Sequence, residues 1–328
     1  MRRHVAGSDM NRVLVTGATG FVGRPVVAAL AAGGYSVRAA ARRALPQDFP
    51  RGVEVVRQPD MTEPVDWQPL LDGVDKVVHL AGTNYSGHGV EAKLYDRVNR
   101  EATADLAAAA ARAGIQQLIY MSSVRAQCGA SADHAVTERD PPAPTDAHGR
   151  SKLAAEEAVR SSGVPFTILR PVLIYGPGMT GSFALLLRAA ASPLPMPVKN
   201  LVARRSLLGI DNFISALELV LSSPAAIGES YLVADPGIPP KLSDIVATLR
   251  EARGYRSIIL PMSTDYVELA LRMIGRRDVW ERFGGNLRID PTKLMAAGWR
   301  PLHDTRAGLT AMIKSPRAQS GGEATARV

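Results

Sequence analysis

Three polar residues occur at positions where acid–base chemistry could take place. Ser123 follows a short apolar run at 117–121 that reads as a buried strand. His148 opens a predicted helix that also carries Lys152, and a spacing of four places both side chains on one helix face. Imidazole is a common general base near neutral pH, and a nearby lysine charge favours its neutral form. We predict Ser123, His148 and Lys152 as the catalytic group.

A glycine turn lies nearer the N-terminus, between a predicted strand and a predicted helix. Its glycines are Gly17, Gly20 and Gly23. The first permits a tight turn, the second lets the backbone approach a pyrophosphate, and the third allows close helix–strand packing. The following helix presents free N–H groups and a partial positive charge to phosphates. Because the turn opens a strand–helix–strand unit, it predicts dinucleotide binding.

The residues after the second predicted strand, 36–41, bear on which dinucleotide binds. A carboxylate there would bind the ribose 2′-hydroxyl and select NAD(H). This chain has Arg42 and Arg43 instead, and guanidinium groups form charge-assisted hydrogen bonds with a 2′-phosphate. NADP(H) is therefore favoured, and NAD(H) is the alternative. Asp60, just after the third predicted strand, is a candidate for contact with the adenine amine.

Short apolar runs alternate with helical stretches through the first half of the chain. The predicted strands are 12–16, 36–41, 53–57, 76–80, 117–121 and 166–169, and the main predicted helices are 21–32, 94–113 and 147–161. This alternation predicts an α/β fold, a Rossmann-type doubly wound parallel sheet with helices on both faces. The loops after the strands then gather at the carboxyl edge of the sheet, where ligands bind.

The pattern changes after Arg170-Pro171. Prolines become dense around 192–198, and helical segments alternate with apolar runs such as 206–209 and 230–233. We predict a dinucleotide-binding domain over 11–175 and a smaller mixed α/β substrate-binding domain over 176–313, with some exchange of chain between them. Residues 1–10 are predicted to form a flexible tail, and 314–328 a disordered tail.

Composition excludes several classes of protein. The 328 residues include one cysteine, Cys128, so no disulfide framework forms within the chain. No apolar run reaches the length of a membrane span, and we expect a cytoplasmic protein. The net charge is +8, but the basic residues are scattered pairs, which favours a small phosphorylated ligand over nucleic acid. The six histidines show no metal-ligand spacing, so no metal is expected.

Several motifs occur in the order seen in extended short-chain dehydrogenases/reductases. They are the glycine turn at 16–23, His79-Leu80-Ala81-Gly82, Asn99 in the long helix, Met121-Ser122-Ser123, Gly149-Arg150-Ser151-Lys152 and Arg170-Pro171. The chain resembles that family from about residue 11 to 313. Segments 176–178, 205–212, 290–293 and 298–301 are most similar to its nucleotide-sugar epimerase, dehydratase and 4-reductase branch, which includes UDP-glucose 4-epimerase.

The resemblance implies roles for particular residues. Cofactor contacts are expected at Gly17, Thr19, Gly20, Phe21, Val22, Gly23, Leu80, Ala81, Gly82, Asn99, Lys152 and Pro171. Lys152 would hold the nicotinamide ribose, and Ser123 would orient a substrate carbonyl. Arg205 and Arg282 would pair with substrate phosphates, and Tyr85 is a substrate contact and an alternative acid. The implied substrate is a nucleotide sugar, oxidised, reduced or epimerised at C4 of a UDP-hexose. Family members often form homodimers through two helices, including the helix that carries the lysine.

The chain departs from the family at the acid–base position. The family has a tyrosine four residues before its lysine, whereas this sequence has His148. Imidazole is shorter than phenol, so reach decides whether it works as a base. His148 is therefore a working substitute, an inert replacement in a binding protein, or a deliberate change that traps a complex. The competing functions are a non-catalytic NADP-binding regulatory protein and a reductase of a non-sugar ketone.

Overall fold

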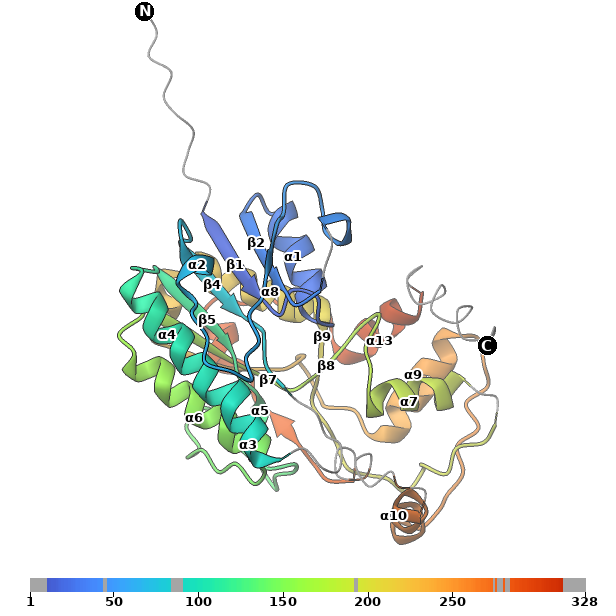
Figure 1. Ribbon diagram of the computed structural model, residues 1–328. Coiled ribbons are helices and arrows are strands. Elements are labelled where there is room, and N and C mark those ends of the chain that lie inside the picture. The colour runs from blue at the N-terminus through green and yellow to red at the C-terminus, as the bar shows by residue number, and fades with distance from the viewer. Residues whose placement is uncertain are drawn as a thin grey trace, which may run out of the picture.

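A parallel β-sheet organises the larger part of the molecule. The computed structural model describes residues 11–43, 46–83, 91–191, 194–273, 275, 280 and 284–314 (Figure 1). Within these ranges the sheet has seven strands in the order β10-β7-β5-β4-β1-β2-β3, and every neighbouring pair is parallel. The strands are β1 (Arg12–Thr16), β2 (Ser36–Ala41), β3 (Glu54–Arg57), β4 (Lys76–His79), β5 (Gln117–Met121), β7 (Phe166–Pro171) and β10 (Ser230–Val233). The predicted Rossmann-type doubly wound sheet is confirmed.

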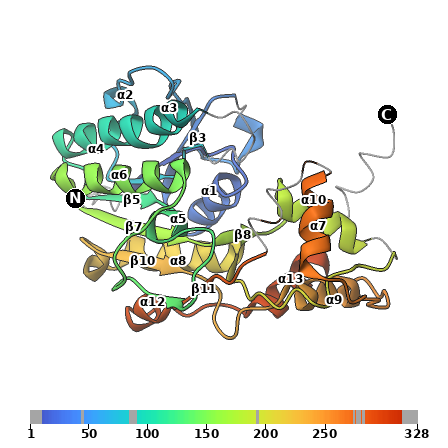
Figure 2. The same ribbon diagram turned by 90° about the horizontal axis from the view of Figure 1, so that it is seen from below.

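Successive strand residues pack against opposite faces of this sheet, and both faces are buried. Val13 and Val15 of β1 belong to one hydrophobic cluster, whereas Leu14 between them belongs to another. Helices cover each face, as Figures 1 and 2 show. The first cluster includes side chains of α1 (Gly23–Ala32) and α8 (Ile210–Ser222), and the second those of α2 (Gln68–Leu71), α4 (Ala102–Arg112) and α6 (Ala147–Ser161). Apolar strands covered on both sides are typical of parallel sheets.

The helix predicted over 94–113 differs from a continuous α-helix. It begins as α3 (Ala92–Tyr95), widens into a π-helical stretch, η2 (Asp96–Glu101), and continues as α4. Asn99 lies in the widened stretch. Because π-helical turns shift the direction of the side chains that follow and often occur at functional sites, this departure from regular geometry is relevant to the position of Asn99.

The smaller part of the molecule packs beside the sheet and has its own core. Phe183, Leu186, Leu249 and Leu309 are among the residues of this third cluster. Figure 2 shows α7, α9, α10 and α13 gathered on one side of the sheet. The elements here and in the connecting loops are η1 (Pro46–Asp48), α5 (Val124–Gln127), β6 (Ala135–Val136), β8 (Leu173–Tyr175), α7 (Ser182–Ala191), β9 (Leu207–Gly209), η3 (Pro224–Ala226), α9 (Leu242–Ala252), α10 (Thr264–Met273), β11 (Arg288–Ile289), α12 (Thr292–Ala296) and α13 (Thr305–Lys314).

The chain passes between the two parts more than once. Helix α8 and strand β10 come after residue 176, yet β10 pairs with β7 at the edge of the main sheet. Residues 1–10 and 315–328 lie outside the described residues, and Lys314, the first residue of the predicted C-terminal tail, is the last residue of α13. In the part of the chain that the structure describes, no helix is both long enough and apolar enough to cross a membrane.

Candidate active site

The glycine turn lies where the strand order of the sheet reverses. Strand β1 has β2 on one side and β4 on the other, so the chain leaves β1 in one direction and later returns to its other side. Gly17 has a φ of +67°, and a Cβ on it would lie 2.8 Å from the Ala81 nitrogen after β4. A Cβ on Gly23 would lie 2.2 Å from the Gly17 carbonyl oxygen. Ligands of doubly wound sheets bind at such a reversal.

The remaining residues of the turn connect it to both parts of the molecule. Thr19, Gly20, Phe21 and Val22 lead into α1, and Val22 packs against the core on that face. Phe21 comes close to the start of the smaller part, since a Cβ on Gly176 would lie 3.5 Å from its ring. A ligand in the turn would therefore be bordered by both parts of the chain.

A series of buried polar side chains, which the sequence analysis did not predict, connects the end of β1 to β4 and α4. The Thr16 hydroxyl accepts a hydrogen bond from the Ala81 N–H and lies 2.7 Å from Nδ1 of His79. The other ring nitrogen lies 3.1 Å from the Thr103 hydroxyl. Burial, aided by the charge of Lys152, lowers the pKa of His79 to about 3, so the ring is neutral at physiological pH. The sequence feature that could have indicated this network is His79, a polar residue within an otherwise apolar predicted strand.

Gly82 and Asn99 meet Lys152 beside the turn. A Cβ on Gly82 would lie 3.0 Å from the Asn99 Oδ1 and 3.3 Å from the Lys152 Nζ. Asn99 is 1% exposed; it accepts a hydrogen bond from the Thr83 N–H and donates to the Thr83 carbonyl and the Ser151 hydroxyl. Asn99 thus joins the segment after β4 to helix α6 and keeps open a small cradle in front of the lysine.

Lys152 is buried and its ammonium group is fixed in position. Nζ donates to the Met121 carbonyl at 2.9 Å and lies 4.9 Å from the centre of the Tyr120 ring. Burial lowers the pKa of Lys152 to about 8, against the opposing influence of Glu156. The lysine is therefore mostly protonated at neutral pH, but it releases its proton more readily than an exposed lysine.

Ser123 and His148 lie at the N-terminal ends of two helices, the short α5 and the longer α6. Ser123 is the N-cap of α5, and its Oγ accepts a hydrogen bond from the Arg125 N–H at 3.1 Å. His148 lies in the first turn of α6, with its ring edge-on to Tyr95 at a centroid distance of 5.9 Å. The Arg125 side chain forms an ion pair with Asp146, the N-cap of α6. That ion pair, which the sequence reasoning also missed, ties the Ser123 turn to the start of α6.

The adenine side of the predicted site has exposed basic residues. Arg42 and Arg43 follow the end of β2 and are exposed. Asp60 is exposed as well, and hydrogen bonds from the Thr62 N–H and hydroxyl lower the pKa of its carboxyl. A residue not predicted, Gln58, is buried beside them, and its Oε1 accepts a hydrogen bond from the Gly17 N–H at 2.6 Å.

Other predicted contacts lie elsewhere or outside the described residues. Pro171 is buried at the end of β7, and Leu80 packs against the core. One Arg205 nitrogen, Nη1, donates to the carbonyls of Ala130 and Gly285, at 3.0 and 2.9 Å. Tyr85 and Arg282 fall outside the described residues. Within the ranges that are described, no three His, Cys, Asp or Glu side chains are grouped so as to hold a metal ion.

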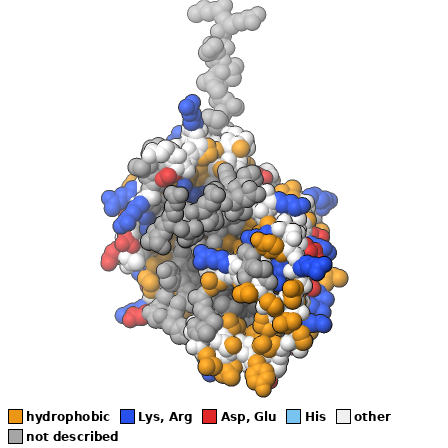
Figure 3. All heavy atoms as spheres, turned by 90° about the vertical axis from the view of Figure 1, so that its right-hand side faces the viewer, with side chains coloured by type: hydrophobic (Ala, Val, Ile, Leu, Met, Phe, Trp, Pro, Cys, Tyr) orange, Lys and Arg blue, Asp and Glu red, His pale blue; other side chains and the backbone are white. Residues whose placement is uncertain are grey.

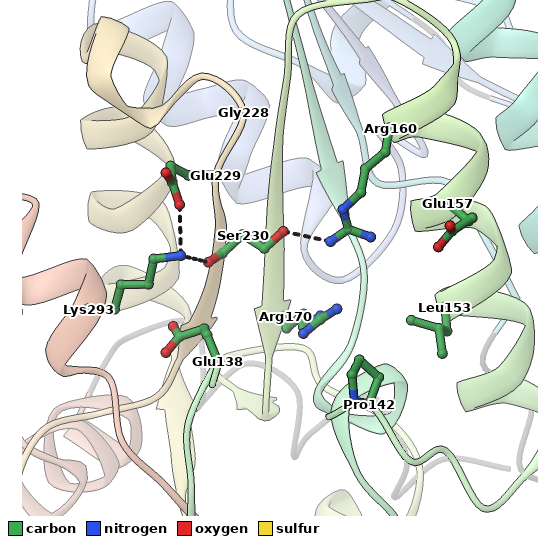
Figure 4. A pocket seen from close by; sticks show the side chains of 10 residues that line it. All are labelled: Glu138, Pro142, Leu153, Glu157, Arg160, Arg170, Gly228, Glu229, Ser230 and Lys293. Carbon is green, nitrogen blue, oxygen red and sulfur yellow. Dashed lines mark hydrogen bonds and ion pairs between the residues drawn. The ribbon is translucent and has the colours of Figure 1, made fainter. Parts of the chain in front are cut away.

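A cavity of about 340 Å³ lies away from this group, beside the edge strand β10 (Figure 4). Several of its charged side chains have partners within the protein. Lys293 lies 2.8 Å from Glu229 and donates to the Ser230 carbonyl, while Arg160 donates to the Ser230 hydroxyl. The cavity is lined by Glu138, Pro142, Leu153, Glu157, Arg160, Arg170, Gly228, Glu229, Ser230 and Lys293. None of the predicted catalytic residues lines it.

A glycine turn lies at a reversal of the sheet order, and Gly82, Asn99 and Lys152 meet just after the neighbouring strand β4. Residues 13–234 match the NAD dependent epimerase/dehydratase family, and the chain belongs to that family. The predicted family resemblance is thereby confirmed.

The similar proteins differ in activity. The chain is 29% identical over 307 residues to a UDP-glucose 4-epimerase of Vibrio cholerae, covering 90% of this chain and 92% of the relative. It is 33% identical over 216 residues to a ceramide reductase of Caulobacter vibrioides, covering 65% of this chain and 61% of the relative. The structure of MoeE5 in complex with UDP-glucuronic acid and NAD is similar in fold, with a TM-score of 0.76 at 23% identity and coverage of 94% and 99% of the two chains.

Proposed function

We propose that the protein is an NADP(H)-dependent oxidoreductase or epimerase that acts at C4 of a UDP-hexose. The observation that carries this proposal is the cradle at Gly82, where a Cβ would lie 3.0 Å from Asn99 Oδ1 and 3.3 Å from Lys152 Nζ. A fixed ammonium group beside an open backbone position suits the hydroxyls of a nicotinamide ribose. The glycine turn would hold the pyrophosphate. When bound, the cofactor supplies the hydride donor or acceptor.

The preference for NADP(H) rests on the end of β2. Ala41 leaves no carboxylate there, and Arg42 and Arg43 are exposed to solvent, where they would bind a 2′-phosphate. The lowered pKa of Asp60 keeps it ionised, as an acceptor for the adenine amine requires. NAD(H) is the alternative, and the MoeE5 structure contains NAD.

The proton chemistry would be carried by the side chains of α5 and α6. The Ser123 Oγ already accepts the Arg125 N–H, so its own hydroxyl hydrogen is available for a substrate carbonyl. His148 would take the hydroxyl proton of the sugar during oxidation and return it during reduction. Lys152, one turn along α6, would anchor the cofactor.

The nucleotide sugar is supported by the epimerase relative, which covers most of both chains. Arg205, Arg282 and Tyr85 are proposed to contact the phosphates and the sugar. The proposal also includes a cytoplasmic protein and a homodimer formed through α6.

A second candidate is reduction of a lipid ketone, which the ceramide reductase relative favours. Ligand binding separates the two functions. Thermal unfolding should be shifted upward by NADPH more than by NADH, and further by UDP-glucose or UDP. A response to NADPH without any response to UDP compounds would favour the second candidate. No response to either pyridine nucleotide would overturn both.

Variants at His148 test catalysis itself. His148→Ala should lower kcat by a factor of about 10² or more, because a general acid–base residue contributes that much. His134→Ala is a matched control, since His134 is an exposed histidine outside the predicted site. His148→Tyr should abolish activity if the imidazole is the working base, and raise it if histidine cripples the site. Unchanged activity in His148→Ala would make the assignment wrong and favour a non-catalytic binding protein.

A further inference from the structure

Lys152 carries its positive charge inside the protein. The lysine and arginine side chains that Figure 3 shows on one face of the molecule lie at the surface, where water solvates their charges. Lys152 is only 5% exposed. A buried charge is costly unless other groups of the protein stabilise it. The neighbours of this ammonium group therefore determine how it is held.

The carboxylate one turn further along α6 is already paired with other groups. Glu156 forms ion pairs with Arg170 and Arg160, and it accepts a hydrogen bond from the Ser122 hydroxyl. Burial lowers the pKa of Lys152 by more than the charge of Glu156 raises it. Glu156 therefore does not fully replace the water that the ammonium group has lost.

An aromatic ring provides a further contact to the lysine. Tyr120 of β5 is fully buried, and the centre of its ring lies 4.9 Å from the Lys152 Nζ. The ring quadrupole attracts a cation within about 6 Å, and more strongly where water is excluded. Burial raises the pKa of the Tyr120 phenol well above its usual range, so the ring stays neutral. No hydrogen bond of good geometry reaches its hydroxyl among the described residues, so a role in holding Lys152 belongs to the ring face.

The ring belongs to a row of side chains that crosses three strands. Thr16 of β1 pairs in register with His79 of β4, and His79 pairs in register with Tyr120. The His79 and Tyr120 rings are stacked, with their centres 5.8 Å apart and their planes inclined by 22°. His79 also contacts the Thr16 hydroxyl, and Gly17 of the glycine turn follows Thr16 in the chain. The row therefore fixes the plane of the Tyr120 ring and connects the glycine turn to Lys152.

The same ammonium group borders the cradle at Gly82. Its Nζ donates to the Met121 carbonyl at 2.9 Å, and a Cβ on Gly82 would lie 3.3 Å from it. In the proposed function this cradle receives the nicotinamide ribose. A displacement of Nζ by an ångström would then misplace the group that binds the ribose hydroxyls.

We propose that Tyr120 is a positioning residue for Lys152, with its ring face holding the ammonium group at the cradle of Gly82 and the stack with His79 fixing the ring. The inference rests on the proposed function of the site. A ring face stabilises the positive charge without neutralising it, and it takes up none of the N–H groups that a ribose hydroxyl needs. A carboxylate in the same place would form an ion pair that competes with the cofactor.

The test compares Tyr120→Phe, which keeps the ring face, with Tyr120→Leu, which removes it. NADPH affinity should fall roughly tenfold or more in Tyr120→Leu and less than about twofold in Tyr120→Phe. Affinity should also decrease as the pH rises and Lys152 loses its proton. Because the ring favours the charged form of the lysine, the midpoint of this decrease should move about one unit lower in pH in Tyr120→Leu. The matched control is Phe213→Leu, which removes a fully buried ring of α8 in the other hydrophobic cluster and should leave affinity and midpoint unchanged.

A measurement without cofactor separates this inference from the proposed function. NMR of the chain with carbon-13-labelled lysine follows the deprotonation of Lys152, and Lys152→Arg identifies its signal. The signal should titrate at a lower pH in Tyr120→Leu than in the natural chain, and at an unchanged pH in Tyr120→Phe. If thermal unfolding shows that Tyr120→Leu is not folded, Tyr120→Met, which fills more of the space, takes its place.

The outcomes are distinguishable. If the natural chain binds neither NADPH nor NADH, the proposed function is wrong, and the titration then decides only the contact between Tyr120 and Lys152. The inference is overturned if Lys152 titrates at the same pH in the natural chain and both Tyr120 variants. It is also overturned if Tyr120→Phe loses as much NADPH affinity as Tyr120→Leu, because the ring face would then not be the part that acts.

Discussion

The two parts of this molecule fix their buried polar groups in different ways. In the sheet part, His79, Asn99 and Lys152 are held by partners one strand or one helix away, and they all support the same ligand-binding edge. Asp235, just after β10, and Arg250 of α9 also bond to residues distant in the chain, and they join segments of the smaller part to one another or to the sheet part. The comparison teaches that the buried polar side chains of the sheet part support the predicted site, whereas Asp235 and Arg250 hold chain segments together.

The first prediction concerns Glu156, which is fully buried on α6 and paired with Arg170 of β7. Ser122 donates to the same carboxylate at 2.5 Å. Glu156→Ala would leave the arginine buried without its charge partner, so the free energy of unfolding should fall by about 3–5 kcal/mol. Urea unfolding measures this loss, and NADPH affinity should fall with it because α6 carries Lys152.

The matched control is Glu157→Ala, the next residue on the same helix, which is exposed. It should change stability by less than about 0.5 kcal/mol. If both variants lose the same stability, the buried ion pair does not organise the site, and the contrast between the two parts weakens.

Much of the sheet part could be predicted because its constraints are local in sequence. Residues 147–161 were predicted as a helix, and α6 has those bounds. Gly17 and Gly23 were singled out from spacing alone, and each occupies a position where a Cβ would collide with backbone. Parallel strands that are buried on both faces have continuous apolar sequences, so the strands of the sheet could be predicted from the apolar runs.

The polar networks could not be predicted, because their partners are distant in the chain. Asp235 accepts hydrogen bonds from Tyr175, Thr305 and Asn212, which are 60, 70 and 23 residues away. No periodicity or motif in the sequence links these residues. The same reason applies to Glu156, whose partner Arg170 was noticed only as part of a strand-end motif.

The second prediction is for Asp235, the centre of a buried network between the end of β10 and the smaller part. Its carboxylate accepts from the Tyr175 hydroxyl at 2.8 Å, the Thr305 hydroxyl at 3.0 Å, the Gly209 N–H at 2.9 Å and Asn212 at 2.7 Å. Asp235→Ala would leave these buried donors without an acceptor and should cost about 3 kcal/mol of unfolding free energy.

Asp235→Ala should leave NADPH affinity nearly unchanged, unlike Glu156→Ala. Asp211→Ala, at an exposed position in the first turn of α8, is the matched control and should cost about 0.5 kcal/mol. Loss of NADPH binding in Asp235→Ala at temperatures where the variant remains folded would show that the two parts are not separable in this way.

The third prediction is a pH dependence that belongs to the sheet part. The pKa of His79 is lowered to about 3 in the folded protein from an ordinary value of 6.5. The unfolded chain therefore binds this proton at higher pH, so the stability contribution is complete above pH 6.5 and is lost as the pH falls toward 3. Between pH 6.5 and 4.5 the loss should be about 2–3 kcal/mol.

Urea unfolding at pH 6.5 and 4.5 should show this loss in the natural chain and a smaller loss in His79→Gln, which has no titrating ring. His134→Gln is the control, because His134 is 58% exposed and its pKa is raised by the hydrogen bond to Asp133. If His79→Gln and the natural chain lose equal stability on acidification, the buried histidine is not the acid-sensitive group of the sheet.

The smallest expected change in stability is at Asp146, the N-cap of α6, which is the helix that carries His148 and Lys152. The Asp146 carboxylate caps the helix by accepting the Gly149 N–H at 2.6 Å, and it also pairs with Arg125. Asp146→Ala removes both contacts and should cost about 1 kcal/mol of unfolding free energy. Asp146→Asn retains the cap while removing the charge, so it should cost only a few tenths of that amount.

The same variants test catalysis. If the ion pair also positions Ser123 relative to His148, kcat should fall in both variants while the NADPH affinity stays constant. A fall confined to Asp146→Ala would assign the effect to the helix cap, and the ion pair would then have no role in aligning the two side chains.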